Sequence, residues 1–355
     1  MNLLPQLPLW AEILVFVGCS AVIWVAGKYL SDYTDVLADR LHLGQALGGL
    51  ILLAVATNLP ELAITYSAAA SGQLDVAVSN ILGGIALQTV VLVALDAFGV
   101  RARRPLTYQA ASLTLVLEGA VVIAVLVAVV MGTQLPASLV RFRLSPDVVL
   151  IAVIWVLGLL LTQRAAKALP WKDSGEAPDS QPQPRGHSKR KKVDGAKKIG
   201  TGRAALVFGI AAVATLVAGA LAEESGTAAA GKVGLSGALF GATVLAAATS
   251  LPELSTGLTS TRAGDYKLAF GDIFGGNAFL PVLFLLATVV SGKAVLPHAH
   301  ASDIYLTGLG ALLTLIYMLG LLFRPTRRHA RLGIDSAAVL IVYVVGVVGL
   351  VVLPN

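Results

Sequence analysis

Long apolar segments, separated by short polar connections, follow one another along the chain. Each is close to the roughly 20 residues that a helix needs to cross the hydrocarbon core of a bilayer. We expect ten spanning helices, at about residues 9–28, 42–70, 74–99, 108–131, 146–163, 204–222, 234–261, 266–291, 303–323 and 333–353. The sequence does not show the ten-residue alternating strands of a membrane barrel. The pattern therefore predicts an all-α polytopic membrane protein.

One polar pattern interrupts two of these apolar segments. Thr-Asn-Leu-Pro-Glu-Leu occupies residues 57–62, and Thr-Ser-Leu-Pro-Glu-Leu occupies residues 249–254, 192 positions later (249 − 57). The same spacing holds for three further matches: Gly72 with Gly264, Asn80 with Asp272, and Gly83-Gly84 with Gly275-Gly276. The chain is therefore expected to contain two copies of one structural unit.

A polar segment divides the ten predicted helices into two sets of five. Residues 164–203 contain four prolines and the basic run Lys189-Arg190-Lys191-Lys192, a composition typical of a flexible linker. This linker separates a first five-helix repeat, residues 1–163, from a second, residues 204–355. Because five is an odd number, equivalent helices of the two repeats would cross the membrane in opposite directions. Such inverted repeats are typical of transporters with a site near the middle of the bilayer.

The charges between the predicted helices indicate an orientation. Only 13% of the residues are charged, against about 25% in soluble proteins. Arginines and lysines gather at 101–104, 164–203 and 324–331, whereas Glu12 and Glu223-Glu224 fall on the other side. The positive-inside rule then places both termini outside and the 164–203 loop in the cytoplasm. Since the basic residues are accounted for in this way, the net charge of +6 does not indicate a nucleic-acid partner.

The repeated pattern places oxygen ligands beside a helix break. Pro60 lacks a backbone donor and clashes with the preceding turn, so the helix must kink or open there. Thr57 and Glu61, about one turn apart, would lie on one face of the helix. Thr249, Ser250 and Glu253 repeat the arrangement in the second half. An acid in hydrocarbon costs roughly 2.5–3.5 kcal/mol on insertion scales, so two equivalent acids indicate a functional site. Oxygen ligands without a His or Cys cluster favour Ca²⁺, Na⁺, Mg²⁺ or Mn²⁺.

The helices that follow the motif add a second pair of polar residues. Asn80 and Asp272 each precede a glycine pair, which allows close approach of neighbouring helices. With Glu61 and Glu253, Asp272 would bring the site to a charge of about −3, so we expect at least one acid to be protonated when no ion is bound, Asp272 before the others. Glu118 is a further acid in a predicted span, where it would either pair with a neighbouring helix or take part in proton movement.

Other function classes fit the sequence less well. A ring of acids can also select cations in a channel, but channels usually build the pore from several subunits, and here one chain supplies both halves. No Ser/His/Asp set, His-Glu-x-x-His motif or phosphate-binding loop occurs in the predicted spans, so an enzyme is not expected. The single Cys19 leaves no disulfide framework or thiolate metal site. We expect no cofactor.

The doubled motif, followed in each half by a Gly-rich Asn or Asp segment, resembles the alpha repeats of the calcium/cation antiporter superfamily, and in particular the prokaryotic sodium/calcium exchangers. The motifs cover about residues 49–90 and 241–283. The resemblance implies that spans two, three, seven and eight form the transport core and that spans one and six slide to alternate access. It implies a monomeric transport unit in a prokaryotic plasma membrane, with Ca²⁺ exchanged for Na⁺ or H⁺ and those ions and the lipid bilayer as partners.

The resemblance also implies a ligand set. Its members would be Thr57, Glu61, Asn80, Thr249, Ser250, Glu253 and Asp272, with the two glutamates shared by Ca²⁺ and Na⁺. Several positions depart from the family pattern: Asn58 and Gly84 replace serines, and Ile85 replaces an asparagine that Asn277 retains. Because Na⁺ sites in this family depend on small hydroxyl groups, these departures bear more on which ion drives the exchange than on the Ca²⁺ site. The Thr-x-x-Pro-Glu form favours Na⁺, with H⁺ as the alternative.

Overall fold

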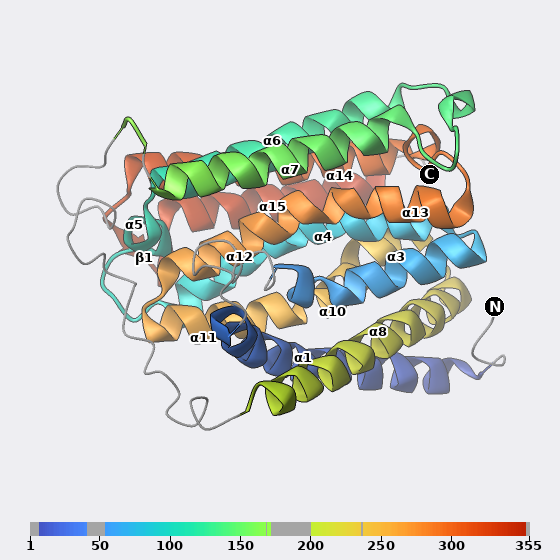
Figure 1. The fold of residues 1–355 in the computed structure, drawn as a ribbon, viewed down its shortest axis with the longest axis horizontal. Coiled ribbons are helices and arrows are strands. Elements are labelled where there is room, and N and C mark those ends of the chain that lie inside the picture. The colour runs from blue at the N-terminus through green and yellow to red at the C-terminus, as the bar shows by residue number, and fades with distance from the viewer. Residues whose placement is uncertain (1–6, 41–53, 168, 172–199, 236, 353–355) are drawn as a thin grey trace.

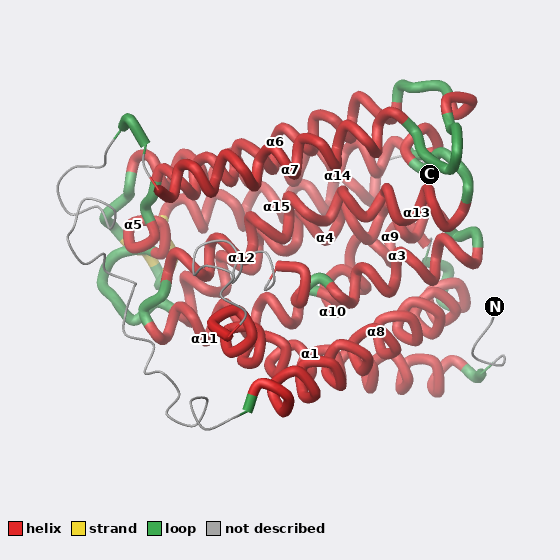
Figure 2. The backbone as a smooth tube through the Cα atoms, in the orientation of Figure 1, coloured by secondary structure: helices red, strands yellow, loops and turns green. Residues whose placement is uncertain are grey.

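Nearly all of the described chain is helical, and the long helices lie side by side along the longest axis of the molecule (Figure 1). The structure, a computed structural model, describes residues 7–40, 54–167, 169–171, 200–235 and 237–352. The basic run at 189–192 and the first part of the second predicted span lie outside the described residues. Figure 2 shows that loops gather at the two ends of the bundle, as expected for helices that cross one membrane.

The two halves contain the following elements. The first half has α1 (Leu9–Arg40), α3 (Leu59–Ser71), α4 (Leu74–Ala94), the π-helical turn η2 (Leu95–Gly99), α5 (Leu106–Ala110), α6 (Leu113–Thr133), the short 3₁₀ turn η3 (Ala137–Leu139) and α7 (Pro146–Lys167). The second half has α8 (Thr201–Lys232), α9 (Gly237–Phe240), η6 (Gly241–Leu245), α10 (Ala246–Thr249), α11 (Leu251–Ala263), α12 (Tyr266–Phe279), η7 (Leu280–Val282), α13 (Leu283–Ser291), η8 (Leu296–His298), α14 (Ala301–Phe323), β1 (Arg328–His329), β2 (Leu332–Gly333) and α15 (Ile334–Val352). The two strands form an antiparallel pair with Arg328 opposite Gly333.

The prediction of an all-α polytopic membrane protein is confirmed. Within the described residues, seven helices are long and apolar enough to cross a membrane, and a shorter apolar helix covers Ile334–Leu350. The two predicted spans that contain the motifs are not continuous helices, because the chain breaks at Asn58 and again at Ser250. The predicted span at 108–131 also differs: residues 111–112 separate α5 from α6.

The two motif helices obey the repeat spacing closely. α3 and α11 both have 13 residues and end at Gly72 and Gly264, whose φ angles are 81° and 86°. Only glycine adopts this left-handed cap conformation without strain. In Figure 1, both helices begin near the middle of the molecule and run towards opposite ends. The two motif helices are therefore oriented in opposite directions, as expected for inverted repeats.

The centre of the bundle is formed by α4 and α12, which are mostly buried, whereas α1, α7 and α8 expose apolar side chains along their length. Phe270 of α12 packs edge-to-face against Phe274 and against Tyr317 of α14, with ring centroids 5.5 Å apart in both pairs. In a membrane, the exposed apolar residues of the outer helices face lipid. The buried polar side chains within α4 and α12, such as Asn80 and Asp272, are then shielded from both lipid and water.

α1 and α8 are the longest helices and lie against each other along one side of the bundle (Figure 1). Each has 32 residues, or about 48 Å at 1.5 Å per residue, which exceeds a hydrocarbon core of about 30 Å. They must therefore tilt or extend beyond the core. At one end, Lys232 of α8 forms a 2.6 Å salt bridge with Glu12 of α1. Both residues fall on the side that the sequence assigns to the exterior.

Candidate cation site

Each motif helix is interrupted one residue after its threonine. Asn58 has φ −89° and ψ 15°, and Ser250 has φ −81° and ψ 3°. The side chain of each breaking residue bonds back to the preceding turn. The side-chain nitrogen Nδ2 of Asn58 donates to the carbonyl of Ala54 at 2.6 Å, and the Ser250 hydroxyl donates to the carbonyl of Ala246 at 2.8 Å. Asn58 thus makes the same local bond as a serine, and its larger amide also reaches further into the site.

The two threonines lie between the repeats. Thr57 and Thr249 are fully buried, and their hydroxyls lie 3.3 Å and 3.2 Å from the carbonyls of Ala54 and Ala246. Thr249 also lies against the carboxylate of Glu61, and Thr57 lies against that of Glu253. Each threonine therefore contacts the glutamate of the other repeat.

The structure brings Glu61 and Glu253 together. Both side chains are fully buried. The side-chain nitrogen Nε2 of Gln88 lies 3.3 Å from Oε1 of Glu61 and 3.3 Å from Oε1 of Glu253. These two oxygens are therefore no more than 6.6 Å apart, twice 3.3 Å. Both acids also lie in the first turns of α3 and α11, where the helix dipoles favour negative charge.

Gln88 is a residue of the site that the sequence motifs do not identify. It comes from α4, is fully buried, and also donates to Oδ1 of Asn58 at 3.3 Å. The repeat spacing of 192 pairs Gln88 with the apolar Leu280. A comparison of the two copies therefore does not identify position 88 as a site residue. A buried glutamine in an apolar span two turns after Asn80 could have been noticed as a polar group in need of a partner.

Asp272 belongs to the same cluster but points partly away from it. One of its oxygens, Oδ2, accepts a 2.8 Å hydrogen bond from Thr256 of α11. Its carboxylate also lies near Thr57 and close enough to Glu253 for their charges to interact. Asn80, at the equivalent position on α4, is fully buried, and neither polar atom of its amide has a hydrogen-bond partner among the described residues. The two equivalent positions therefore differ: Asp272 accepts a hydrogen bond from Thr256, and the Asn80 amide has no partner in the described part of the chain.

Several buried oxygens of the cluster lack a hydrogen-bond partner within the described part of the chain. They are Oε2 of Glu61, Oε2 of Glu253, Oδ1 of Asp272 and Oε1 of Gln88. Unpartnered buried oxygens are costly, and a cation is a group that can satisfy several at once. In the described residues no three acidic, histidine or cysteine side chains converge tightly enough to hold a metal by themselves. A cation between the glutamates would therefore also need neutral oxygens and a shift of the Gln88 amide.

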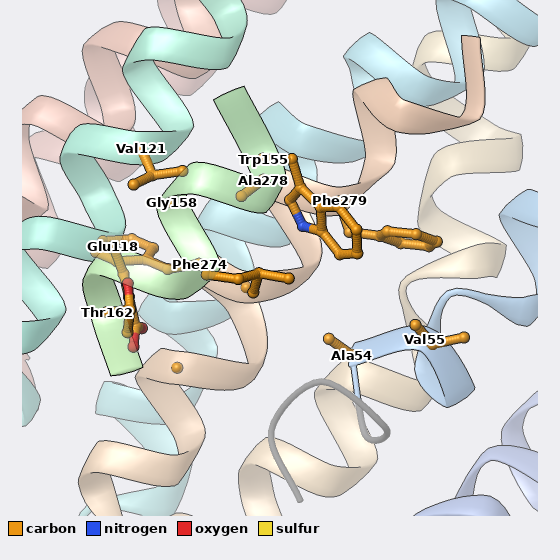
Figure 3. Close-up of a pocket in the computed structure, with 13 residues that line it drawn as sticks. Ala54, Val55, Glu118, Val121, Trp155, Gly158, Thr162, Phe274, Ala278 and Phe279 are labelled. Carbon is orange, nitrogen blue, oxygen red and sulfur yellow. The ribbon is translucent and has the colours of Figure 1, made fainter. Parts of the chain in front are cut away.

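Glu118 lies in a pocket between α6, α7 and α12 (Figure 3). The pocket has a volume of about 60 Å³, which is room for a few waters. Its walls include Thr162, Trp155, Phe274 and Ala54. Oε2 of Glu118 is buried and has no hydrogen-bond partner in the described residues. The expected pairing with a neighbouring helix is thus not seen for this oxygen.

Two broken helices from inverted halves, which meet at buried acids inside a membrane bundle, are the features of secondary transporters with a midplane ion site. The comparisons with known proteins agree with this class. The sequence profile of the family described as "Sodium/calcium exchanger protein" matches residues 11–164 and 203–352. The chain belongs to this sodium/calcium exchanger family, within the calcium/cation antiporter superfamily. It is therefore a transporter and not an enzyme.

Relatives and solved structures resemble the chain over most of its length. The inner membrane protein YrbG of Escherichia coli (strain K12) is 27% identical over 83% of this chain and 84% of its own. CaxA of Alkalimonas amylolytica, provisionally named an antiporter, is 27% identical over 87% of this chain and 89% of its own. The crystal structure of the H⁺/Ca²⁺ exchanger CAX matches with a TM-score of 0.66 at 15% identity, over 97% of this chain and 82% of CAX. The sodium-calcium exchanger NCX_Mj matches with a TM-score of 0.58 at 14% identity, over 96% and 99%. At these identities the two structures establish the fold alone.

Proposed function

We propose that this cation antiporter exchanges Ca²⁺ for Na⁺ by alternating access around the cluster of Glu61 and Glu253. The supporting observation is that these two acids, one from each inverted half, are buried together and each leaves one oxygen without a partner among the described residues. Oxygen ligands of this kind suit Ca²⁺ and Na⁺. If the pair holds either Ca²⁺ or Na⁺ but not both, the two fluxes are coupled.

The proposed ligands are those that the sequence indicates: Thr57, Glu61, Asn80, Thr249, Ser250, Glu253 and Asp272. The hydroxyls of Thr57 and Thr249 lie against the glutamates, where they can add neutral oxygens to the carboxylates. Asn80 and Asp272 would complete the shell on either side. Because Asp272 bonds to Thr256, it would have to turn to reach a central ion.

The membrane arrangement follows the two halves. We place residues 1–163 and 204–355 as the inverted repeats, the 164–203 linker in the cytoplasm, and both termini outside. α1 begins and α15 ends at the end of the bundle where Lys232 pairs with Glu12, and α8 begins at the opposite end (Figure 1). One chain supplies both halves of the site, so a monomer would suffice for transport.

Exchange in proteoliposomes tests this function. An outward Na⁺ gradient should drive Ca²⁺ into proteoliposomes that contain the wild-type protein. Glu61→Gln and Glu253→Gln should each abolish this uptake. Asp75→Asn, at an exposed position on α4, serves as the control and should retain it. Full activity in either glutamate variant would refute the proposed site.

The alternative is exchange of H⁺ for Ca²⁺ at the same glutamates. Carboxylates are the groups of the site that bind a proton, and protonation of the pair would release Ca²⁺. Uptake of Ca²⁺ driven by a pH gradient in sodium-free buffer, with no response to Na⁺, would select this alternative. Repeating both gradients with Mn²⁺ would define the divalent ion.

A further inference from the structure

The connection between α6 and α7 ends in a tight hairpin. The backbone nitrogen of Arg141 donates to the carbonyl of Leu144 at 2.8 Å, and the nitrogen of Leu144 donates to the carbonyl of Arg141 at 2.9 Å. The two residues between them, Phe142 and Arg143, have φ angles of 53° and 60°. Two-residue turns with this left-handed backbone are usually formed by Asn-Gly pairs. Here a phenylalanine occupies the tip and is 98% exposed.

The second repeat contains the same turn with a different tip. α7 and α15 begin 188 positions apart (334 − 146). The same shift takes Phe142 to Ala330, whose φ angle is 48°, and the next residue, Arg331, has a φ angle of 73°. The turn therefore forms with alanine at this position. The fold does not require the phenyl ring of Phe142, and the protein leaves it uncovered.

The hairpin is held at one edge of the bundle. The Nη1 atom of Arg143 donates to the carbonyl of Val289 at 3.1 Å, which ties the hairpin to the last turns of α13. In Figure 1, α6 and α7 lie along the edge opposite α1 and α8, and the connection between them lies at the end where α1 begins. The tip is thus fixed beside a lipid-facing edge.

The apolar surface of this edge continues onto the connection. α7 exposes most of its apolar side chains, and beyond its first residue the exposed side chains of Leu139, Phe142 and Leu144 extend the same kind of surface. Apolar side chains that face lipid are favourable, whereas in water they carry the cost of the hydrophobic effect. The established lipid-facing surface is therefore the neighbour that fits these residues.

The charges beside the tip suit a lipid headgroup region. Arg141 is exposed next to the ring, and an arginine can lay its methylene groups on apolar surface while its guanidinium bonds to phosphate. Aromatic residues are enriched at the same depth of a membrane. A second copy of the chain fits less well, because two facing tips would bring Arg141 and Arg143 of both copies together, and like charges repel.

We propose that the hairpin between α6 and α7 is a bilayer anchor. Phe142 inserts into the boundary between headgroups and acyl chains, and Arg141 binds lipid phosphate beside it. Through the bond of Arg143 to Val289, the anchor holds α7 and α13 to the membrane at the edge opposite α1 and α8. The proposal does not depend on which ions are transported.

A spin label next to the tip tests the proposal. Leu139→Cys carries the nitroxide while Phe142 stays in place, and Cys19→Ala removes the buried natural cysteine. In vesicles of phosphatidylethanolamine and phosphatidylglycerol, collisions of the label with oxygen, which dissolves in lipid, should exceed those with a water-soluble nickel chelate. Adding Phe142→Asn should reverse this order, and adding Phe142→Leu should preserve it. Because asparagine tolerates a positive φ, a reversal would not reflect damage to the turn.

A second measurement needs no label. In nanodiscs of the same lipids, trypsin should cut after Arg141 or Arg143 several-fold faster in Phe142→Asn than in the wild type, because the tip leaves the bilayer. Ala330→Asn is the matched control, since it places the same residue at the equivalent turn of the second repeat. It should leave cleavage at the hairpin between α6 and α7 unchanged.

The outcomes are decisive in either direction. An excess of oxygen collisions that Phe142→Asn reverses, together with faster cleavage, supports the anchor. An excess of nickel collisions with Phe142 in place would put the tip in water and overturn it. Exclusion of both reagents would overturn it in favour of a protein contact, and spectral broadening that disappears on dilution with unlabelled protein would identify a second copy. An unchanged result for Phe142→Asn in either measurement also overturns the role of the ring.

Discussion

Gly27 on α1 packs directly against Pro252 in the first turn of α11. A Cβ on Gly27 would lie 2.7 Å from the Cβ of Pro252, closer than two such atoms can approach. The repeat spacing of 192 takes Gly27 to Gly219 on α8, where a Cβ would lie 3.0 Å from the carbonyl oxygen of Pro60. Each long helix therefore touches the broken helix of the other repeat at its proline. α1 and α8 therefore both contact the helix breaks beside the glutamate pair.

Gly27→Ala and Gly219→Ala should each impair the protein. An added methyl has no room at Gly27 and only a tight fit at Gly219, where the nearest backbone atom would lie 3.0 Å away. Overpacking typically costs about 1–3 kcal/mol. We expect a lower Tm in detergent and a lower maximal exchange rate. The controls are Gly18→Ala on α1 and Gly209→Ala on α8, since a Cβ on either glycine meets nothing within 4 Å. Equal effects of the contact and control substitutions would show that the close packing has no role.

Thr57→Val and Thr249→Val should weaken cation binding. Each hydroxyl lies against the glutamate of the opposite repeat, and a hydrogen bond to a charged group contributes about 1.5–3 kcal/mol. The Ca²⁺ concentration for half-maximal exchange should rise at least tenfold, while Thr57→Ser and Thr249→Ser retain most of the affinity. Thr259→Val, at an exposed threonine on α11 whose hydroxyl donates to the carbonyl of Ser255 in the same helix, should leave the value unchanged. Normal affinity in both valine variants would remove these hydroxyls from the site.

Arg328→Ala should destabilise the end of the bundle opposite the Lys232–Glu12 pair. Arg328 of β1 lies 3.6 Å from Asp96 and donates to the carbonyl of Ala102 at 2.8 Å. Asp96 is fully buried and also accepts bonds from the backbone of Leu106 and Gly333. Removing one partner of a buried pair typically costs about 3–5 kcal/mol, so the Tm should fall markedly.

The site itself lies elsewhere, so the folded fraction of Arg328→Ala should keep its Ca²⁺ affinity. Arg327→Ala, one residue earlier and exposed, is the control and should keep the wild-type Tm. An unchanged Tm in Arg328→Ala would contradict the role of this ion pair.

Glu118→Gln should retain exchange driven by Na⁺. Glu118 lines a pocket between α6, α7 and α12, and the hydrogen bonds to the glutamate pair described above come from Gln88 and not from Glu118. The substitution keeps the shape of the side chain and removes its charge. Ca²⁺ uptake measured under Na⁺ and under pH gradients should be the same as in the wild type. A selective loss of uptake under the pH gradient would instead assign Glu118 to proton movement.

The repeat and its breaks could be predicted because they depend on local chemistry. Proline cannot continue a helix, so Pro60 and Pro252 predicted interruptions that the structure places at Asn58 and Ser250. The repeat spacing also matched Gly72 with Gly264, and in the structure the two motif helices end at these left-handed glycines. The role of Asn58 was less predictable. From the sequence it is a departure from the serine of the family pattern, but in the structure its side-chain amide donates to the preceding turn, as Ser250 does in the other half.

The sequence by itself determined the membrane class, the inverted repeat and the pair of acids, because apolar length, proline and charge act through neighbouring residues. Only the tertiary structure decided that Gln88 lies between those acids and that Gly27 meets Pro252. These contacts join residues 165 and 225 positions apart (253 − 88 and 252 − 27). No local pattern encodes them, since they depend on how whole helices pack.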